Sequence, residues 1–361
     1  MKAGKTLSEL AAEVTRQQSH KIDFVADTRQ LRLETDPNGS CIHGIAQGAV
    51  GQYDLTENAH RQIAARADIP RRYYDRIRSQ HPGLLDTTIN TIWDGEPERR
   101  MVRTLDGEAR AFLSDRYRRL DNADVLEQVL PVLAESELEL ASCEITESRL
   151  YLKVRFPLLQ QELNAPTGNG HGAGRGGDLV ESAITISNSE VGLGSLSVTP
   201  AVYTHACTNM MMIKSASVKK YHLGRAGDDG VQQVLTEETR RADDRALWLR
   251  LRDVVRASMS REWFFETIQK MNAAQADKIE NDPVAAVEVL QSRASLTDGE
   301  RSSVLVNLIN GGDLSRLGLL NAVTRSAESA ADYDRATELE GLGGDILTLD
   351  RSAWREIAAK N

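Results

Sequence analysis

The spacing of apolar residues changes along the chain, and this change is the strongest constraint on the fold. Between residues 21 and 202, short stretches alternate apolar and polar side chains, which is the pattern of strands with one buried face. After Gly230 the apolar residues recur at helical spacing almost to the end. We therefore predict an α+β fold, with an antiparallel or mixed sheet core and packed helices, followed by a helical C-terminal region.

Turn and cap signals suggest how the chain is divided. We expect an N-terminal helical lead over residues 1–20, an α+β core over residues 21–228 and a helical region over residues 229–361. Inside the core, residues 164–178 are dominated by glycine, with six glycines between 168 and 177. This composition predicts a flexible loop, because it offers too little apolar surface to bury.

Several local patterns predict individual elements. Thr56 is expected to cap a helix that runs to about Ala67, and Pro70 to begin a second helix. Residues 138–145 and 149–156 read as a hairpin whose second strand buries its leucines and exposes Tyr151, Lys153 and Arg155 to solvent. The run GLGG at 341–344 reads as a loop or cap signal.

The composition of the chain indicates in which cellular compartment the protein is expected. The 361 residues contain no apolar run long enough to span a membrane, and the first residues lack the apolar core of a secretory signal. The three cysteines are an odd number and lie far apart in the sequence, which fits a reducing environment better than a disulfide framework. We therefore expect a cytoplasmic protein without a membrane partner.

The common catalytic motifs are missing from the sequence. Gly4, Lys5 and Thr6 resemble the end of a phosphate-binding loop, but the glycine that this loop needs five residues earlier would precede the first residue. There is no HExxH, no GxSxG and no acidic residue two positions before a lysine. A non-enzymatic role without a cofactor is therefore favoured over catalysis.

A metal site remains an alternative. Cys41 and His43 are two positions apart, as are His205 and Cys207, and such residues share one face of a strand. If the two strands were neighbours, the four side chains could bind zinc, and Glu190 is a further candidate ligand. The competing interpretation is that these thiols and imidazoles are buried structural groups. A metal-dependent enzyme is thus one alternative function.

Charge is distributed unevenly along the chain. Residues 60–120 contain 13 arginines and 9 acidic residues, so this band carries a formal charge of +4. Since the net charge of the chain is −9, the remaining residues together carry −13. A second band, residues 191–227, has no acidic residue. Arginines beside tyrosines can contact phosphates while the rings stack on unpaired bases. The candidate nucleic-acid-binding residues are Arg71, Arg72, Tyr73, Tyr74, Arg110, Arg116, Tyr117, Arg118, Arg119, Lys219 and Lys220.

Two other interpretations of these bands stay open. They could be solvated faces of helices and strands, with tyrosines packed beneath arginine side chains. The predicted helix pair over residues 56–79 could alternatively be a helix-turn-helix that presents Arg71, Arg72 and Tyr74 to a DNA major groove.

Three longer segments carry a family resemblance. They are RAFLSDRYRRLDN at 110–122, ITISNSEVGLGSLSVTPAVYTHACTNMM at 184–211, and NAVTRSA with DYDRATELEGLGG at 321–327 and 332–344. With these motifs the chain resembles the phage and plasmid family that shares the domain of unknown function 932. The resemblance spans most of the chain and implies a mobile genetic element, where DNA is the common substrate.

By analogy with phage single-strand annealing proteins, we expect a homo-oligomer that binds single-stranded DNA in recombination or replication. Besides the metal-dependent enzyme, a further alternative is an anti-defence or protein-interaction factor that works through its acidic surface.

Overall fold

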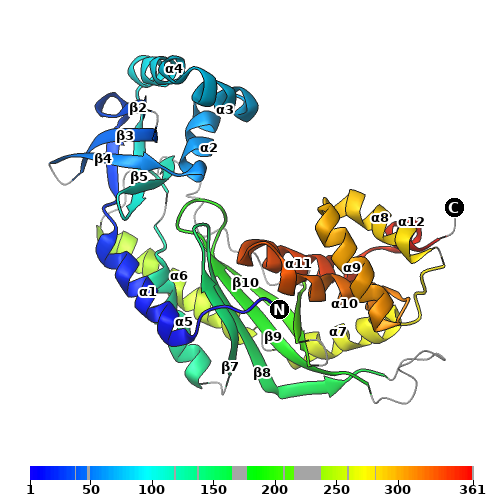
Figure 1. Cartoon of the computed structure of the whole chain (residues 1–361). Coiled ribbons are helices and arrows are strands. Elements are labelled where there is room, and N and C mark those ends of the chain that lie inside the picture. Colours follow the sequence, from blue (N-terminus) through cyan, green and yellow to red (C-terminus); the bar gives the residue numbers. More distant parts are fainter. Residues whose placement is uncertain are drawn as a thin grey trace.

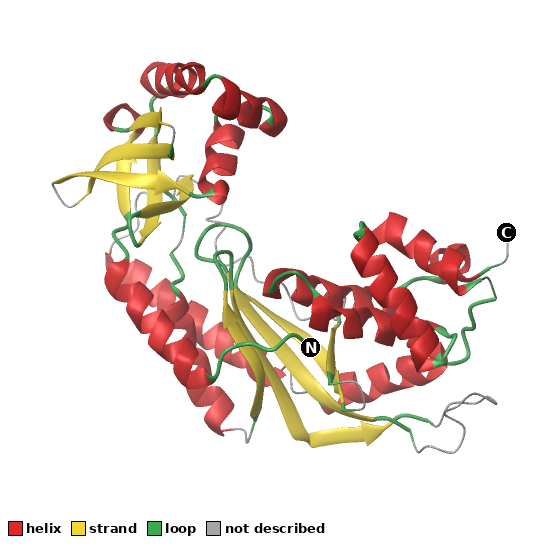
Figure 2. Ribbon diagram, viewed as in Figure 1, coloured by secondary structure: helices red, strands yellow, loops and turns green. Residues whose placement is uncertain are grey.

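The computed structural model describes residues 1–36, 38–46, 49–117, 119–135, 138–164, 177–205, 208–214, 237–257, 260–280 and 282–359. Within these ranges the chain forms two β-sheets with helices packed around them, so the fold is α+β as predicted (Figure 1). Figure 2 shows that the C-terminal third of the chain is helical, which was also predicted.

The first sheet has six strands in the order β1-β5-β6-β4-β3-β2. Its neighbouring strands are antiparallel, except that β4 and β6 are parallel over a short stretch. The strands are β1 (Phe24–Asp27), β2 (Arg32–Asp36), β3 (Gly39–Ala46), β4 (Ala49–Leu55), β5 (Arg99–Leu105) and β6 (Glu108–Ser114), with a short 3-10 helix, η1 (Thr28–Gln30), after β1.

Three helices cover this sheet: α2 (Glu57–Arg66), α3 (Arg71–Gln80) and α4 (Pro82–Gly95). The Thr56 hydroxyl accepts a hydrogen bond from the Ala59 amide at the start of α2, which confirms the predicted cap. The helices bury apolar side chains against the sheet and form with it a hydrophobic core of their own, which contains Ile63, Tyr74, Ile77, Leu85, Ile89, Trp93, Val102 and Phe112.

The second sheet has five antiparallel strands in the order β11-β10-β9-β8-β7. Its strands are β7 (Glu139–Ile145), β8 (Leu150–Glu162), β9 (Leu179–Asn188), β10 (Ser197–Thr204) and β11 (Asn209–Met212). Its apolar face packs against α1 (Leu7–His20) and α5 (Asn122–Glu135), and α6 (Glu237–Ala257) packs against α5. The predicted hairpin is confirmed as β7 and β8.

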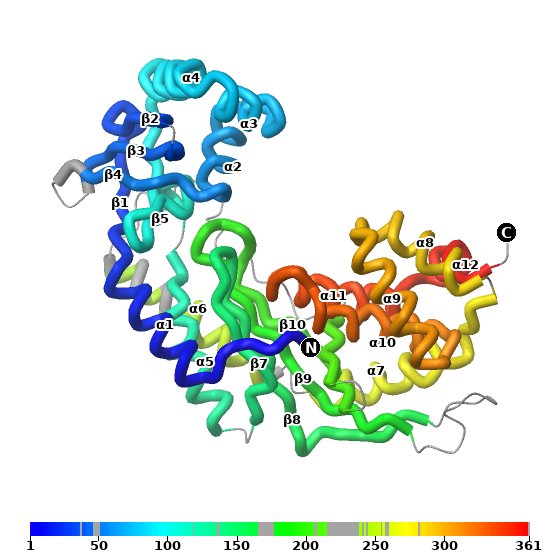
Figure 3. Tube along the Cα trace, in the orientation of Figure 1, coloured from blue at the N-terminus to red at the C-terminus, as the bar shows by residue number. Residues whose placement is uncertain are grey.

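The remaining helices are α7 (Arg261–Ala274), α8 (Pro283–Ala294), α9 (Asp298–Gly311), α10 (Arg316–Ser326), α11 (Tyr333–Thr348) and α12 (Arg351–Ala358), with a 3-10 helix, η3 (Ala327–Ser329), before α11. Among them, α10 and α11 pack on the edge strand β11 (Figure 3).

The sequence GLGG proved to be part of a helix, not a loop or a cap. It lies inside α11, where a Cβ atom on Gly344 would overlap the backbone oxygen of Met212 in β11. The absence of this side chain lets the helix and the strand approach closely. Packing, not a chain reversal, explains this glycine.

The prediction of a solvated face on β8 was also wrong. Tyr151 is 5% exposed and Lys153 is completely buried, because α11 covers this side of the sheet. Lys153 makes an ion pair of 2.6 Å with Glu340 of α11, which is completely buried as well. The polar alternation of β8 therefore marks an internal interface between the sheet and α11.

The described residues contain two large hydrophobic cores. The six-stranded sheet and α2 to α4 have one core, whereas the five-stranded sheet shares a second, continuous core with α1, α5 and the C-terminal helices. Most of the predicted flexible loop, residues 165–176, lies outside the described residues. In the part of the chain that is described, no helix combines the length and apolarity needed to span a bilayer.

Candidate functional site

The outer face of α3 combines the predicted binding residues Arg72 and Tyr73 with Arg76, which was not predicted. The helix contains four arginines and one aspartate, and it buries Tyr74 and Ile77 against the core. Arg72 and Arg76 are exposed one turn apart, and the neighbouring residue Tyr73 is 51% exposed. Neither arginine makes an ion pair with a described residue, so both charges are available for a ligand.

Two other predicted residues of α3 are engaged within the protein. Arg71 pairs with Glu57 and with Asp75, so its charge is largely compensated. Tyr74 is completely buried, and its hydroxyl lies 2.9 Å from Nδ1 of His60. Burial raises the pKa of the Tyr74 hydroxyl. The prediction that Tyr74 stacks on a base or reads a major groove is therefore wrong, because its ring belongs to the core.

The segment after β6 holds the second predicted cluster. Arg116 and Arg119 are exposed, whereas Arg118 lies outside the described residues. The hydroxyl of Tyr117 donates a hydrogen bond to the backbone oxygen of Ser189 at 3.0 Å, and its ring packs against Met101, Leu113 and Val191. Tyr117 thus anchors this segment, and its ring is partly buried.

Arg110 is a structural residue, in contrast to its predicted role as a phosphate contact. It is 9% exposed and donates to Glu190 at 3.1 Å. Glu190 is 2% exposed, also accepts from Lys21 at 2.6 Å, and accepts from the amide of Asn122 at the start of α5. Burial alone would raise the pKa of Glu190, but the charges of Lys21, Arg103 and Arg110 lower it.

Arg103 completes this buried charge network, and sequence reasoning missed it. Its guanidinium group is completely buried, donates to Asp23 at 2.9 Å and to Asp121, and also donates to the backbone oxygen of Glu190. The sequence offered one signal for a buried arginine. Arg103 stands inside a strand between Val102 and Thr104, and both of these neighbours are buried. The network links the segment before β1, the strands β5 and β6, the start of α5 and the turn between β9 and β10.

A cavity of about 510 Å³ lies at this junction. Arg61, Arg71 and Arg110 line it together with Glu57, Glu108 and Glu147, so opposite charges balance along its wall. The Nε atom of Arg110 has no hydrogen-bond partner among the described residues. The balanced charges make this cavity a weaker candidate for nucleic acid than the outer face of α3.

The predicted zinc ligands do not come together. Cys41 and His43 lie on β3 of the six-stranded sheet, whereas His205 follows β10 of the five-stranded sheet, and Cys207 lies outside the described residues. His43 lies 2.9 Å from Glu34, and Nε2 of His205 lies 2.6 Å from Glu181. No group of three or more potential metal ligands occurs in the described ranges.

Glu190 fits a metal site poorly as well. Its carboxylate is already held by Lys21 and Arg110, and the positive charge around it would repel a cation.

The second basic band is only partly described. Lys219 and Lys220, both predicted to contact phosphates, lie outside the described residues. Lys214 is described, is exposed, and its Nζ atom lies 3.6 Å from a carboxylate oxygen of Asp345 in α11.

Comparison of the chain with protein-family models, with curated proteins and with solved structures found no match.

Proposed function

We propose that this protein binds single-stranded DNA in the cytoplasm through the outer face of α3, and that it acts in recombination or replication of a phage or plasmid. One observation carries the proposal: two exposed arginines without ion-pair partners in the described chain flank an exposed tyrosine on one helix. The family resemblance supports DNA as the ligand.

The geometry of α3 suits a single strand. Residues four apart on a helix have Cβ atoms roughly 5–6 Å apart, so Arg72 and Arg76 can contact phosphates of one strand. Tyr73 stands beside them with half of its surface exposed, and an unpaired base can stack on such a ring. Duplex DNA hides its base faces, which favours a single-stranded ligand.

Arg116 and Arg119 extend the proposal to a second contact. Both are exposed and without an ion-pair partner within the described residues, on the segment between β6 and α5. Tyr117 fixes this segment to the turn before β10 through its hydrogen bond to Ser189. A DNA strand bound at both places would contact four arginine side chains.

We also propose that the protein self-associates, as annealing proteins do.

Binding can be tested by fluorescence anisotropy with labelled single-stranded and double-stranded DNA over a range of salt concentrations. The logarithm of the binding constant should fall with the logarithm of salt by about 0.7 for each phosphate contact on a single strand. Replacing both Arg72 and Arg76 by alanine should lower this slope by about 1.4 and weaken binding at low salt.

The C-terminal helix α12 supplies a matched control. Arg351 and Arg355 are also exposed, four residues apart on one helix, and lie far from α3 in sequence. The Arg351→Ala/Arg355→Ala variant changes net charge equally and should leave the slope unchanged. If both double variants weaken binding alike, the effect is one of net charge and α3 is not the site.

Tyr73 separates stacking from simple charge attraction. Tyr73→Ala should weaken single-strand binding by about 1–3 kcal/mol, while Tyr73→Phe keeps the ring and most of the affinity. Neither change should affect folding, because the side chain is half exposed. Absence of single-strand binding by the unchanged protein at low salt would refute the proposal, and light scattering of the same sample tests self-association.

A further inference from the structure

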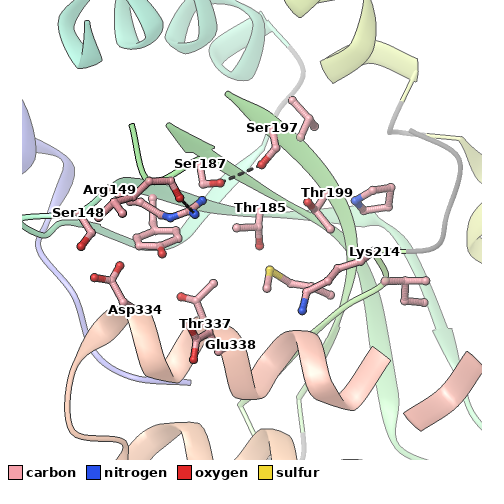
Figure 4. Close-up of a pocket in the computed structure, with 16 residues that line it drawn as sticks. Ser148, Arg149, Thr185, Ser187, Ser197, Thr199, Lys214, Asp334, Thr337 and Glu338 are labelled. Carbon is pink, nitrogen blue, oxygen red and sulfur yellow. Dashed lines mark hydrogen bonds between the residues drawn. The ribbon is translucent and has the colours of Figure 1, made fainter. Parts of the chain in front are cut away.

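A polar cavity lies between the five-stranded sheet and α11. Its volume is about 520 Å³, within the range of small-molecule sites in proteins. Figure 4 shows Asp334, Thr337 and Glu338 of α11 facing the sheet, with Arg149 and Lys214 toward opposite ends. None of the residues that line this cavity belongs to α3, so a ligand here is independent of DNA binding there.

The sheet contributes a regular array of hydroxyl groups to this cavity. Ser187 and Thr185 are two residues apart on β9, and their partners on β10 are Ser197 and Thr199. Alternation places all four side chains on the same face, directly opposite one another in pairs. An array of hydroxyls on a buried sheet face is unusual, because strand positions under a helix are ordinarily apolar.

These hydroxyls retain hydrogen-bonding capacity. Thr199 makes no side-chain hydrogen bond with a described residue, and Thr185 reaches only the sulfur of Met210 at 3.4 Å. Ser187 and Ser197 bond to each other at 2.9 Å, which leaves one of the two hydroxyl hydrogens free. A ligand that both donates and accepts hydrogen bonds would satisfy them.

The charges around the cavity balance. Arg149 and Lys214 supply two positive charges, and Asp334 and Glu338 supply two negative ones. Asp334 already accepts from Thr146, and Glu338 accepts from Arg335, but each carboxylate has room for further donors. The lining therefore offers no excess of charge to a strongly anionic or cationic ligand.

We propose that this cavity binds a neutral ligand with vicinal hydroxyl groups, either a ribonucleoside or a free monosaccharide. Such a ligand donates to the carboxylates of Asp334 and Glu338 and exchanges hydrogen bonds with the strand hydroxyls. Hydrogen bonds to carboxylates are charge-assisted and strong for neutral partners. Binding bridges the sheet and α11, so it stabilises the folded chain.

Calorimetric titration and thermal unfolding with adenosine, uridine, D-ribose and D-glucose test the proposal. We expect binding and a concentration-dependent rise in the unfolding temperature with at least one of them. Binding of adenosine or uridine without D-ribose would identify a nucleoside, and binding of a free sugar a monosaccharide. 2′,3′-Dideoxyadenosine, which lacks the diol, should bind at least about tenfold more weakly than adenosine if a nucleoside is the ligand.

The Thr199→Val variant tests directly whether the strand hydroxyls bind the ligand. It removes a hydroxyl that bonds to no described residue, keeps the shape of the side chain, and should weaken ligand binding about fivefold. Thr204→Val on the opposite face of β10 is the matched control and should not change binding.

Glu338 gives an independent variant on α11. Glu338→Gln should weaken binding, whereas Glu356→Gln on α12, a similarly exposed acid paired with one arginine, should not.

The proposal is overturned if none of the four compounds binds at millimolar concentration, or if adenosine monophosphate binds better than every neutral compound. It is also overturned if the ligand affinity of Thr199→Val equals that of the unchanged protein.

Discussion

The buried ion pair between Lys153 and Glu340 makes a prediction in which two substitutions respond oppositely to pH. The two side chains are completely buried, 2.6 Å apart, and Nζ of Lys153 lies 4.3 Å from the centre of the Tyr333 ring. Burial lowers the pKa of Lys153 and raises the pKa of Glu340, because the interior disfavours both charges. Each residue offsets the burial cost of the other.

Removing one partner should destabilise the fold by about 3–5 kcal/mol near neutral pH, because the remaining group must either stay charged without a partner or give up its charge on folding. In Glu340→Gln, Lys153 must be neutral when folded but is protonated when unfolded, so the free energy of unfolding increases as pH rises. In Lys153→Met, Glu340 holds its proton when folded but is ionised when unfolded, so the free energy of unfolding decreases as pH rises. Each slope approaches about 1.4 kcal/mol per pH unit.

Urea unfolding followed by circular dichroism at pH 6, 7 and 8 measures these slopes relative to the unchanged protein. The double variant Lys153→Met/Glu340→Leu should recover most of the lost stability, since well-packed apolar residues can replace a buried pair. The exposed pair Arg16 and Asp106 is the control, and its loss should cost less than about 1 kcal/mol. Equal pH slopes for the two single variants would refute this account.

Two further predictions concern stability. Gly344→Ala should destabilise the protein by about 1–3 kcal/mol, because its Cβ would meet the Met212 oxygen, whereas Gly299→Ala in α9, where the added carbon meets no atom, should raise the melting temperature. Burial first, and then the charge of Arg78, lowers the pKa of His60 to about 4. The unfolded imidazole has a pKa near ~6.5, so the contribution of His60, up to about 3 kcal/mol, is present above that value and is lost as pH falls toward 4. Urea unfolding of His60→Gln between pH 7 and 4 checks this, and the variant should lose less stability over that interval than the unchanged protein; an identical pH dependence would contradict it.

The candidate binding surface was only partly visible in the sequence. The run of arginines and tyrosines at residues 71–74 indicated a basic aromatic helix, and the helical period could have shown that Tyr74 shares the apolar face with Ile77. Arg110 could not be assigned in this way, because its partner Glu190 lies 80 residues away. Exposure, which decides whether an arginine can contact a ligand, depends on such long-range pairing.

The sequence by itself determined the local structure: the cap at Thr56, the β7 and β8 hairpin, and the change from strands to helices all follow from the spacing and type of neighbouring residues. The tertiary structure alone decided what covers each face. A two-residue period groups Tyr151, Lys153 and Arg155 on one side of β8, but it is the same whether water or α11 lies above them. Only the packing of α11, with its glycines against β11, buries Lys153 beside Glu340 and encloses the hydroxyl-lined cavity.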